Sequence, residues 1–369
     1  MKLNLISTCL SAVIAASAFG ATFAQADAVA DAVAYVAEAT KTNPPWTGPT
    51  TGPAAQTGMT IVYVAADLRN GGVLGVSEGI EEAASSIGWT VRVMDGQGSV
   101  SGRSAALQQA IALSPDGIIL GSVDANEQAQ AIIQADAAGI KIVGWHATAT
   151  TGPSDTHPIF TNITTDPLEI SRAAASLVVA DSEGRAGVVI FTDSVYEIAI
   201  AKSDAMADVI RACETCTLLG IEDTPLAEAS NRMPPLTNSL LQRYGDDWNY
   251  SLTINDLPFD FMASALQSAG RASDGFPRNI SAGDGSQAAF QRIQTKYYQF
   301  GTVAEPLRLH GWQAVDEMNR ALSGEPDSGY VVPVHLFTPD NVTADGGANF
   351  AFDPDNGYRD AYQAIWAGQ

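Results

Sequence analysis

The chain has 369 residues, of which 46% are hydrophobic, and it carries a formal net charge of −22 at pH 7. A chain of this length usually divides its core between two domains. The strong negative charge excludes nucleic acid as an expected partner, because neutralising phosphate groups requires clustered Lys and Arg residues.

Residues 1–26 have the pattern of a secretory signal peptide. Lys2 is their only charged residue, an apolar run extends from Leu10 to Ala24, and Ala24-Gln25-Ala26 has the small-x-small pattern that signal peptidase recognises. The apolar run is too short and too Ala-rich to suit a membrane anchor. We therefore predict cleavage near Ala26 and export of a soluble protein, whose charge becomes −23 because only Lys2 is removed.

The next segment, 27–57, is predicted to be a short Ala-rich helix followed by a linker. Asn43 to Gly58 contains four prolines, which favours a linker or a surface strap.

From Thr60 onward, strand and helix patterns alternate with short connections. The first set is predicted to contain the strands Thr60–Ala66, Thr90–Asp95, Gly117–Gly121 and Lys141–Trp145 and the helices Val73–Ile87, Ser104–Leu113 and Ala125–Ala138. After the polar stretch Ala147–His157, the second set contains the strands Ala186–Thr192, Thr217–Ile221, Tyr250–Asn255 and Asn279–Gly283 and the helices Leu168–Ala180, Val195–Arg211, Arg232–Arg243 and Phe259–Ala269. Repeated units of this kind predict an α/β fold with two doubly wound parallel sheets.

The last part of the sequence is expected to complete both domains. It contains the segment Gln287–Gln294, the strand Gln299–Val303, the helix Leu307–Leu322 and the strand Tyr330–Leu336. The predicted division is an N-terminal lobe of 58–147 plus 306–333, a C-terminal lobe of 148–305 plus 334–345, and a C-terminal extension of 346–369. Because the chain then crosses between the lobes more than once, the crossings form a hinge.

Two cysteines remain after processing, in the sequence Cys213-Glu214-Thr215-Cys216. Redox enzymes place such a pair at a helix N-terminus, which lowers the thiol pKa. Here the pair follows a helical pattern, so a structural disulfide is favoured over a catalytic one.

The sequence shows no pattern typical of catalysis, of a metal or of a cofactor. The loop Gly96–Gly102 lacks the G-x-G-x-x-G spacing, and no G-x-S-x-G elbow is present. The four histidines, at 146, 157, 310 and 335, have no spacing typical of metal ligands. We therefore predict a binding protein without cofactor or metal.

Polar side chains follow several of the predicted strands, where an open parallel sheet binds its ligands. Each could recognise hydroxyl groups or, alternatively, could cap a helix or be part of a solvated turn; the second alternative is strong for Asp166 and Asp256, which begin helical patterns. Lys202 interrupts the helical stripe of Val195, Ile198, Met206 and Val209, so it either reaches the rim of the core or faces a polar cavity. The candidate positions at or after the ends of the predicted strands are Asp67, Asn70, Trp145, His146, Asn255, Asp284 and Glu305.

The segments Ile61–Asp95, Asp116–Trp145, Val188–Ile210 and Asn279–Leu322 together resemble the ribose-binding-protein-like periplasmic substrate-binding proteins of sugar ABC transporters. The resemblance covers roughly 58–340 and implies two lobes joined by three crossings, with a ligand enclosed between them. It implies ligand contacts in the first loop at Ala66, Asn70, Gly72 and Val73, and further contacts at His146, Ala147, Lys202, Asn255, Asp284 and Glu305.

Two positions depart from the pattern of that family. Gly72-Val73 stands where an aromatic pair often sandwiches a pyranose, and His146-Ala147 stands where an Asp-Arg pair is common. Trp145, Tyr196 or Phe259 are the candidates for replacing the missing aromatic contact. A monosaccharide other than ribose, or a linear sugar alcohol, is therefore the expected ligand.

The resemblance implies a monomeric periplasmic protein that delivers its ligand to the membrane permease of an ABC importer. The alternatives are a protein that presents a ligand to a chemoreceptor, and a secreted enzyme on an α/β scaffold. The fold alone does not separate these classes.

Overall fold

The computed structural model describes residues 28–42 and 45–369. The predicted signal peptide lies outside the described residues. Within the described ranges, no helix combines the length and the apolar character that crossing a membrane requires.

The first half of the fold is built on a parallel sheet, sheet A, which consists of five strands in the order β2-β1-β3-β4-β5. The central strand β1 is apolar from Ile61 to Ala65 because both of its faces are covered, as is usual in parallel sheets. The strands are β1 (Thr60–Ala65), β2 (Thr90–Asp95), β3 (Gly117–Gly121), β4 (Lys141–Trp145) and β5 (Asn162–Ile163).

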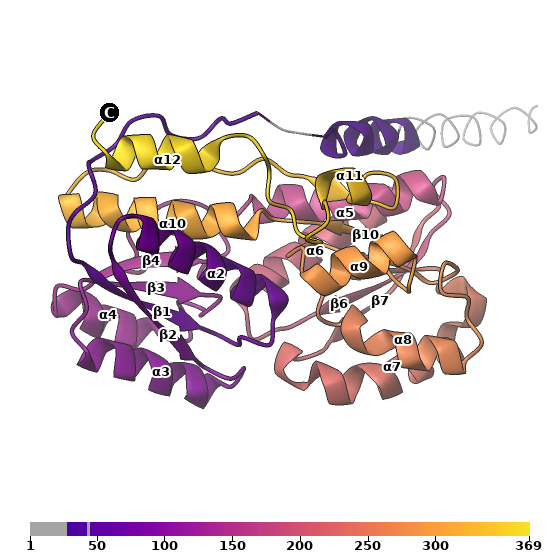
Figure 1. The fold of residues 1–369 in the computed structure, drawn as a ribbon. Coiled ribbons are helices and arrows are strands. Elements are labelled where there is room, and N and C mark those ends of the chain that lie inside the picture. The colour runs from indigo at the N-terminus through magenta and orange to yellow at the C-terminus, as the bar shows by residue number, and fades with distance from the viewer. Residues whose placement is uncertain (1–27, 43–44) are drawn as a thin grey trace, which may run out of the picture.

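Alternate residues of β1 pack against helices on opposite faces of sheet A. Ile61, Tyr63 and Ala65 belong to a core with α2 (Gly71–Ser86), α10 (Leu307–Ser323) and α12 (Tyr358–Trp366). Val62 and Val64 belong to a second core with α3 (Val100–Ala112) and α4 (Ala129–Ala137). We call sheet A with these five helices the N-terminal lobe (Figure 1).

The second half repeats this plan on sheet B, whose six strands have the order β11-β10-β9-β8-β6-β7. All of its pairings are parallel except that of the edge strand β11, which runs antiparallel to β10. The strands are β6 (Gly187–Thr192), β7 (Thr217–Asp223), β8 (Tyr250–Thr253), β9 (Arg278–Ser281), β10 (Gly301–Val303) and β11 (Leu336–Phe337).

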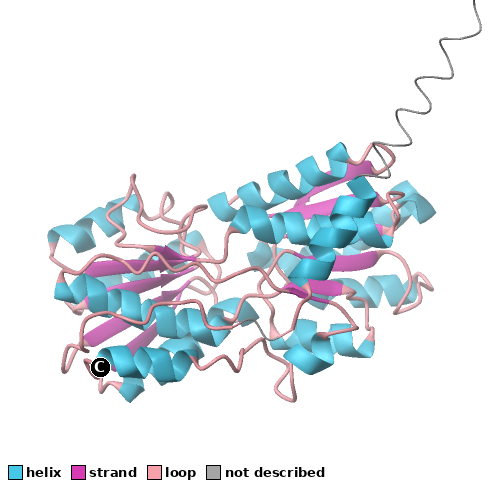
Figure 2. Cartoon of the chain, turned by 90° about the horizontal axis from the view of Figure 1, so that it is seen from above, coloured by secondary structure: helices cyan, strands magenta, loops and turns pink. Residues whose placement is uncertain are grey.

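Helices cover both faces of sheet B, and we call sheet B with these helices the C-terminal lobe. On one face lie α5 (Pro167–Asp181) and α6 (Glu197–Ala212), and on the other lie α7 (Ala229–Tyr244) and α8 (Phe259–Ser268). At the edge, α9 (Gln287–Thr295) and α11 (Val342–Asp345) pack with Phe290 and Phe337. Two short 3-10 helices, η1 (Leu226–Glu228) and η2 (Gly245–Asp247), flank α7. The predicted class, two doubly wound α/β domains, is confirmed (Figure 2).

The chain passes between the two sheets at three internal places. It leaves sheet A after β5, returns before α10 and leaves again before β11. Because β5 pairs with β4, sheet A extends to Ile163, beyond the boundary at 147 that the sequence suggested. We propose that the first lobe boundary lies between Ile163 and Pro167.

Both terminal segments also cross from one lobe to the other (Figure 1). Residues 28–39 form a helix on α5, where the Tyr35 hydroxyl donates to Glu169 over 2.6 Å. The chain then continues to Trp46, which packs with rings of the N-terminal lobe such as Tyr362. At the other end, α11 contacts α9, whereas α12 contacts α10.

Most predicted elements are present, with ends that differ by a few residues, and two expectations about them are wrong. The predicted strand Tyr330–Leu336 is wrong, because Tyr330–His335 is an irregular crossing that contains Pro333, and only Leu336–Phe337 pairs in a sheet. Asp256 does not cap α8; it accepts hydrogen bonds from Ser281 and from the loop that follows β9. Three elements, β5, α11 and α12, have no counterpart among the predicted strands and helices.

The expected disulfide is present. Cys213 and Cys216 are bonded directly after the C-terminal end of α6. This position is opposite to the helix end that activates a redox cysteine, which agrees with a structural role.

The predicted cap of α5 is confirmed and gives a stability test. The Asp166 carboxylate accepts hydrogen bonds from the amides of Leu168 (2.9 Å) and Glu169 (3.4 Å). We expect Asp166→Ala to lower the free energy of unfolding by about 1 kcal/mol, the usual cost of losing such a cap. Urea unfolding measures the loss. Ligand affinity should stay within twofold of the parent, and a large fall in affinity would contradict a purely local cap.

Candidate functional site

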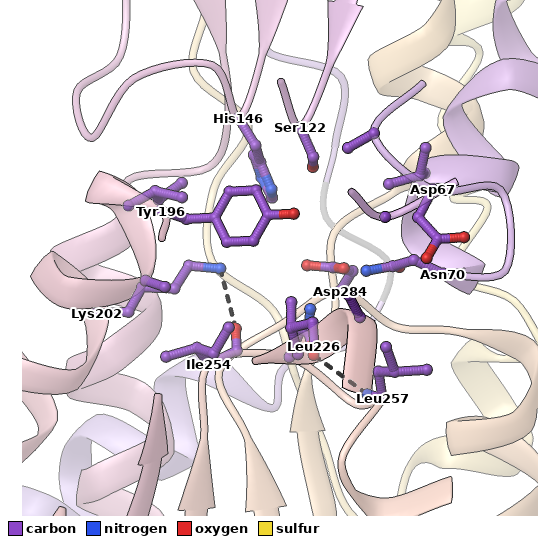
Figure 3. A pocket seen from close by; sticks show the side chains of 17 residues that line it. Asp67, Asn70, Ser122, His146, Tyr196, Lys202, Leu226, Ile254, Leu257 and Asp284 are labelled. Carbon is purple, nitrogen blue, oxygen red and sulfur yellow. Dashed lines mark hydrogen bonds between the residues drawn. The ribbon is translucent and has the colours of Figure 1, made fainter. Parts of the chain in front are cut away.

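A cavity lies between the two lobes, at the carboxyl ends of the strands of both sheets (Figure 3). This is the place where ligands bind to open α/β sheets. Side chains reach it from loops of both lobes, and much of its wall is aliphatic. Its lining consists of Ala66, Asp67, Asn70, Val73, Gly98, Ser122, His146, Tyr196, Ile198, Ala199, Lys202, Leu226, Ala227, Ile254, Asn255, Leu257 and Asp284.

The N-terminal lobe contributes four polar side chains to the cavity. Asn70 caps α2, because its Oδ1 accepts a hydrogen bond from the Gly72 amide over 2.8 Å. The Asp67 carboxylate is already engaged by the Arg69 guanidinium (2.6 Å). Ser122 follows β3, and His146 follows β4 (Figure 3).

The C-terminal lobe supplies Tyr196, Lys202, Asn255 and Asp284. Lys202 lies on α6 and is 3% exposed, and its ammonium group donates to the carbonyls of Ala282 (2.9 Å) and Ile254 (3.4 Å). Of the two alternatives considered for Lys202, the structure therefore favours the polar cavity. Asn255 has a local role as well, since its Oδ1 accepts from the Leu257 amide over 3.2 Å.

Asp284 has the most available carboxylate in this wall. It is 5% exposed, and its carboxylate receives no hydrogen bond from the described residues. Burial raises its pKa to about 6, although Lys202 and His146 act in the opposite direction. A buried acceptor without a partner is the kind of group that a ligand hydroxyl would satisfy.

The first loop approaches Asp284 so closely that only glycine fits there. A Cβ atom at Gly72 would lie 2.4 Å from Asp284 Oδ2, and one at Gly71 would lie 2.7 Å from Ser286 Cβ. The resemblance implied a ligand contact at Gly72. In this structure Gly72 instead lets the N-terminal lobe rest against the loop that carries Asp284.

Glu305 contacts the His146 ring but does not line the cavity. His146 Nε2 and Glu305 Oε2 lie 2.7 Å apart, and neither atom has a hydrogen-bond partner within the part of the chain that the structure describes. The other oxygen of Glu305 accepts from the Thr165 amide over 2.8 Å. Glu305 is fully buried, and although burial raises its pKa, the neighbouring His146, His310 and Lys202 lower it well below the usual range.

Trp145 packs against His146, and His310 in turn accepts a hydrogen bond from Trp145. The Trp145 ring stacks on the His146 ring with centroids 4.0 Å apart, and its indole nitrogen donates to His310 Nδ1 over 3.1 Å. Burial lowers the pKa of His310 to about 4, so that histidine is neutral at pH 7. Trp145 and Glu305, which the sequence suggested as direct ligand contacts, therefore do not line the cavity. Phe259 lies in the core of the C-terminal lobe, away from the cavity.

His146, Asp284 and Glu305 also form a cluster of side chains that could hold a metal ion. Each offers one suitable atom, and these atoms lie within 4.8 Å of one another. Sequence spacing did not indicate this cluster, because its members follow three different strands. The Lys202 ammonium group lies close enough to affect the pKa of both carboxylates, and a cation there competes with a metal. We therefore interpret the cluster as a set of hydrogen-bonding groups.

Sequence reasoning missed part of the lining. Ser122 directly follows β3 and could have been found by the rule that identified His146. Leu226 and Ala227 lie in η1, in a loop after β7 that carries no polar pattern. Ala147, which the resemblance implied, packs in the core of the N-terminal lobe instead.

The raised pKa of Asp284 predicts opposite pH effects on folding and on binding. An unfolded aspartate loses its proton near its ordinary pKa of 3.8, whereas folded Asp284 keeps it up to about pH 6. This group therefore contributes stability below pH 3.8, and the contribution is lost as the pH rises through about 6. The ionised carboxylate is the better acceptor for ligand hydroxyls.

We therefore expect the dissociation constant to decrease between about pH 5 and about pH 7.5. Calorimetric titrations across this range measure the change, and Asp284→Asn should remove most of it. The same pH dependence in the Asn variant would assign the titration to another group.

Three comparisons with known proteins bear on this site. The sequence profile of the periplasmic binding protein domain matches residues 61–326. The curated ABC transporter periplasmic-binding protein YphF of Escherichia coli (strain K12) is 24% identical over 165 residues, which are 43% of this chain and 50% of YphF. The chain thus matches about half the length of that relative.

Two solved structures share the fold. An ABC transporter solute-binding protein of Agrobacterium vitis with bound allitol is 21% identical, with a TM-score of 0.66, over 78% of this chain and 97% of the other. A second Agrobacterium vitis solute-binding protein, bound with α-D-tagatopyranose, is 16% identical, with a TM-score of 0.69, over 80% of this chain and 99% of the other. At these identities the likeness concerns the fold.

Proposed function

The chain belongs to the periplasmic binding protein domain family, and on that basis we propose that it captures a monosaccharide or a sugar alcohol between its two lobes. The observation that carries the proposal is the cavity between the lobes, whose wall combines Asn70 and His146 from one lobe with Lys202 and Asp284 from the other. A ligand that contacts both sets stabilises the closed arrangement of the lobes.

The chemistry of the wall suits hydroxyl groups. Lys202 donates hydrogen bonds, the Asp284 carboxylate accepts them, and the amide of Asn70 can do both. Aliphatic side chains such as Val73 and Ile198 cover the remaining surface, and Tyr196 contributes a phenol ring to the lining. Among the described residues of the lining, no two rings face each other as they would to sandwich a pyranose, so an open-chain polyol fits it as well as a ring does. The solved relatives with bound allitol and tagatopyranose support this class of ligand.

We further propose that the protein binds its ligand without transforming it, in the periplasm after removal of residues 1–26. Delivery to the membrane permease of an ABC importer then follows from the family to which the chain belongs. The protein would act as a monomer, because both walls of the cavity come from one chain.

A thermal-shift screen of residues 27–369 tests the proposal. The panel contains hexoses, pentoses and alditols, including D-allitol and D-tagatose, with amino acids and dicarboxylates as matched non-sugar controls. A ligand that binds only the folded protein raises the melting temperature with its concentration. We expect at least one polyhydroxylated compound to do so. A response confined to the control classes would overturn the sugar assignment.

A further inference from the structure

The N-terminus of helix α6 is capped by a side chain from the opposite lobe. The Glu197 amide, in the first turn of α6, donates to Asp124 Oδ2 over 2.9 Å. Asp124 follows β3 in the N-terminal lobe, whereas α6 covers sheet B in the C-terminal lobe. The residue at the cap position of α6 itself, Tyr196, makes no side-chain capping bond. The residue that caps α6 therefore belongs to the N-terminal lobe, although the helix belongs to the C-terminal lobe.

Two more side chains of the N-terminal lobe contact the same short segment of α6. Arg103 donates to the Tyr196 hydroxyl over 3.1 Å, with its guanidinium carbon 5.2 Å from the centre of that ring. Asn126 donates to the Glu197 carboxylate over 3.2 Å. Arg103 is in turn fixed by an ion pair with Glu127. We call Asp124, Arg103 and Asn126 together the latch.

The latch is anchored firmly on its own side of the cleft. Asp124 is 5% exposed, and its Oδ1 accepts hydrogen bonds from the amides of Asn126 (2.9 Å) and Glu127 (3.1 Å). This leaves Oδ2 directed at the N-terminus of α6, where the helix dipole favours a negative charge. If the lobes separate, the Glu197 amide loses its partner and Asp124 Oδ2 loses its donor. The contact therefore belongs to the closed arrangement alone.

Helix α6 links the latch to the cavity. Tyr196 and Lys202 both lie in the lining, whereas no member of the latch does. Lys202 is on the same helix as the capped amide, so fixing the first turn of α6 against the N-terminal lobe also fixes where the ammonium group stands.

We propose that the latch holds the lobes together before ligand binds, with Asp124 as a positioning residue that acts through α6. The proposal rests on the function proposed above, since it concerns the closed form that would enclose the ligand. Asp124 thereby shifts the equilibrium between the open and the closed arrangement of the lobes, although it does not line the cavity.

The test uses Asp124→Asn in the ligand-free protein. Aspartate accepts hydrogen bonds with both of its oxygens, whereas the asparagine side chain has only one oxygen. If that oxygen accepts from the amides of Asn126 and Glu127, the NH2 group faces the Glu197 amide, and two donors then face each other. The matched control is Asp166→Ala, which removes the cap of α5 made by a residue adjacent in sequence. Two readouts are measured: hydrogen exchange of the peptide that covers the first turn of α6, and the radius of gyration in solution.

For Asp124→Asn we expect exchange in the first turn of α6 to be about fivefold faster, as loss of a helix cap implies, together with a larger radius of gyration. Asp166→Ala should lower the melting temperature and leave both readouts as in the parent. The latch is refuted if Asp124→Asn changes neither readout, or if the control changes both equally. Because no ligand is added, an unsuccessful sugar screen and a failed latch are separate outcomes.

Discussion

Replacing Asp284 by alanine is expected to weaken ligand binding at least tenfold, which corresponds to about 1.4 kcal/mol. Its carboxylate is buried in the wall of the cavity and receives no hydrogen bond from the described residues, so a ligand hydroxyl would be its main partner. Removing it leaves that hydroxyl unpaired in a closed site, at a cost of about 1–3 kcal/mol or more. Calorimetric titration with the strongest compound of the sugar panel measures the effect.

The same substitution should not destabilise the fold at pH 7. Burial raises the pKa of Asp284 to about 6, which means that its ionised form is less favourable in the folded protein than in the unfolded chain. Melting temperatures of the ligand-free variant and parent check this. Equal affinity in the variant and the parent would remove Asp284, and the cavity assignment built on it, from the site.

Glu305→Ala is expected to lower the free energy of unfolding by about 1–3 kcal/mol, because it leaves the buried Thr165 amide without its acceptor. Glu305 is fully buried, lies 2.7 Å from His146 and accepts from the Thr165 amide. It stands in the crossing before α10, whereas Thr165 stands in the crossing before α5. Its carboxylate therefore joins two crossings of the hinge to the residue at the end of β4.

Chemical unfolding of parent and variants measures this loss. Glu305→Gln is the matched control, because the amide oxygen can still accept from Thr165 while the negative charge is absent. We expect the glutamine variant to lose less stability than the alanine variant. If the free energy of unfolding of Glu305→Ala equals that of the parent, the contacts of Glu305 with Thr165 and His146 have no structural importance.

The fold was predictable from the sequence because its strands and helices have strong periodic patterns. The family resemblance, the two α/β domains and the disulfide are confirmed. The strand expected at Tyr330–Leu336 failed for a physical reason: the apolar residues there belong to a crossing between lobes, where Tyr330 packs on Trp46 and not in a sheet. A local pattern cannot distinguish these two uses of apolar side chains.

The cavity was partly predictable for the same reason. Parallel strands bring their carboxyl ends to one edge, which places the polar residues that follow the strands next to the site. His146, Asn255 and Asp284 were found in this way, and Lys202 was found because it interrupts an apolar stripe. Their roles as ligand contacts remain a prediction.

The support around the cavity was not predictable, because it depends on partners far apart in the sequence. Asp124 and the amide that it caps are 73 positions apart, and Glu305 and Thr165 are 140 positions apart. The sequence placed Trp145 and Glu305 near the cavity. It did not show that both side chains contact His146 and do not line the cavity.

A crystal structure of the protein with its strongest polyhydroxylated ligand tests the central claim most directly. We predict one ligand molecule in the cavity between the lobes, with hydroxyl groups within hydrogen-bond distance of Asp284 and Lys202 on one side and of Asn70 or His146 on the other. Ligand bound on the outer surface of either lobe, or a cavity that stays without ligand at saturating concentration, would contradict the account.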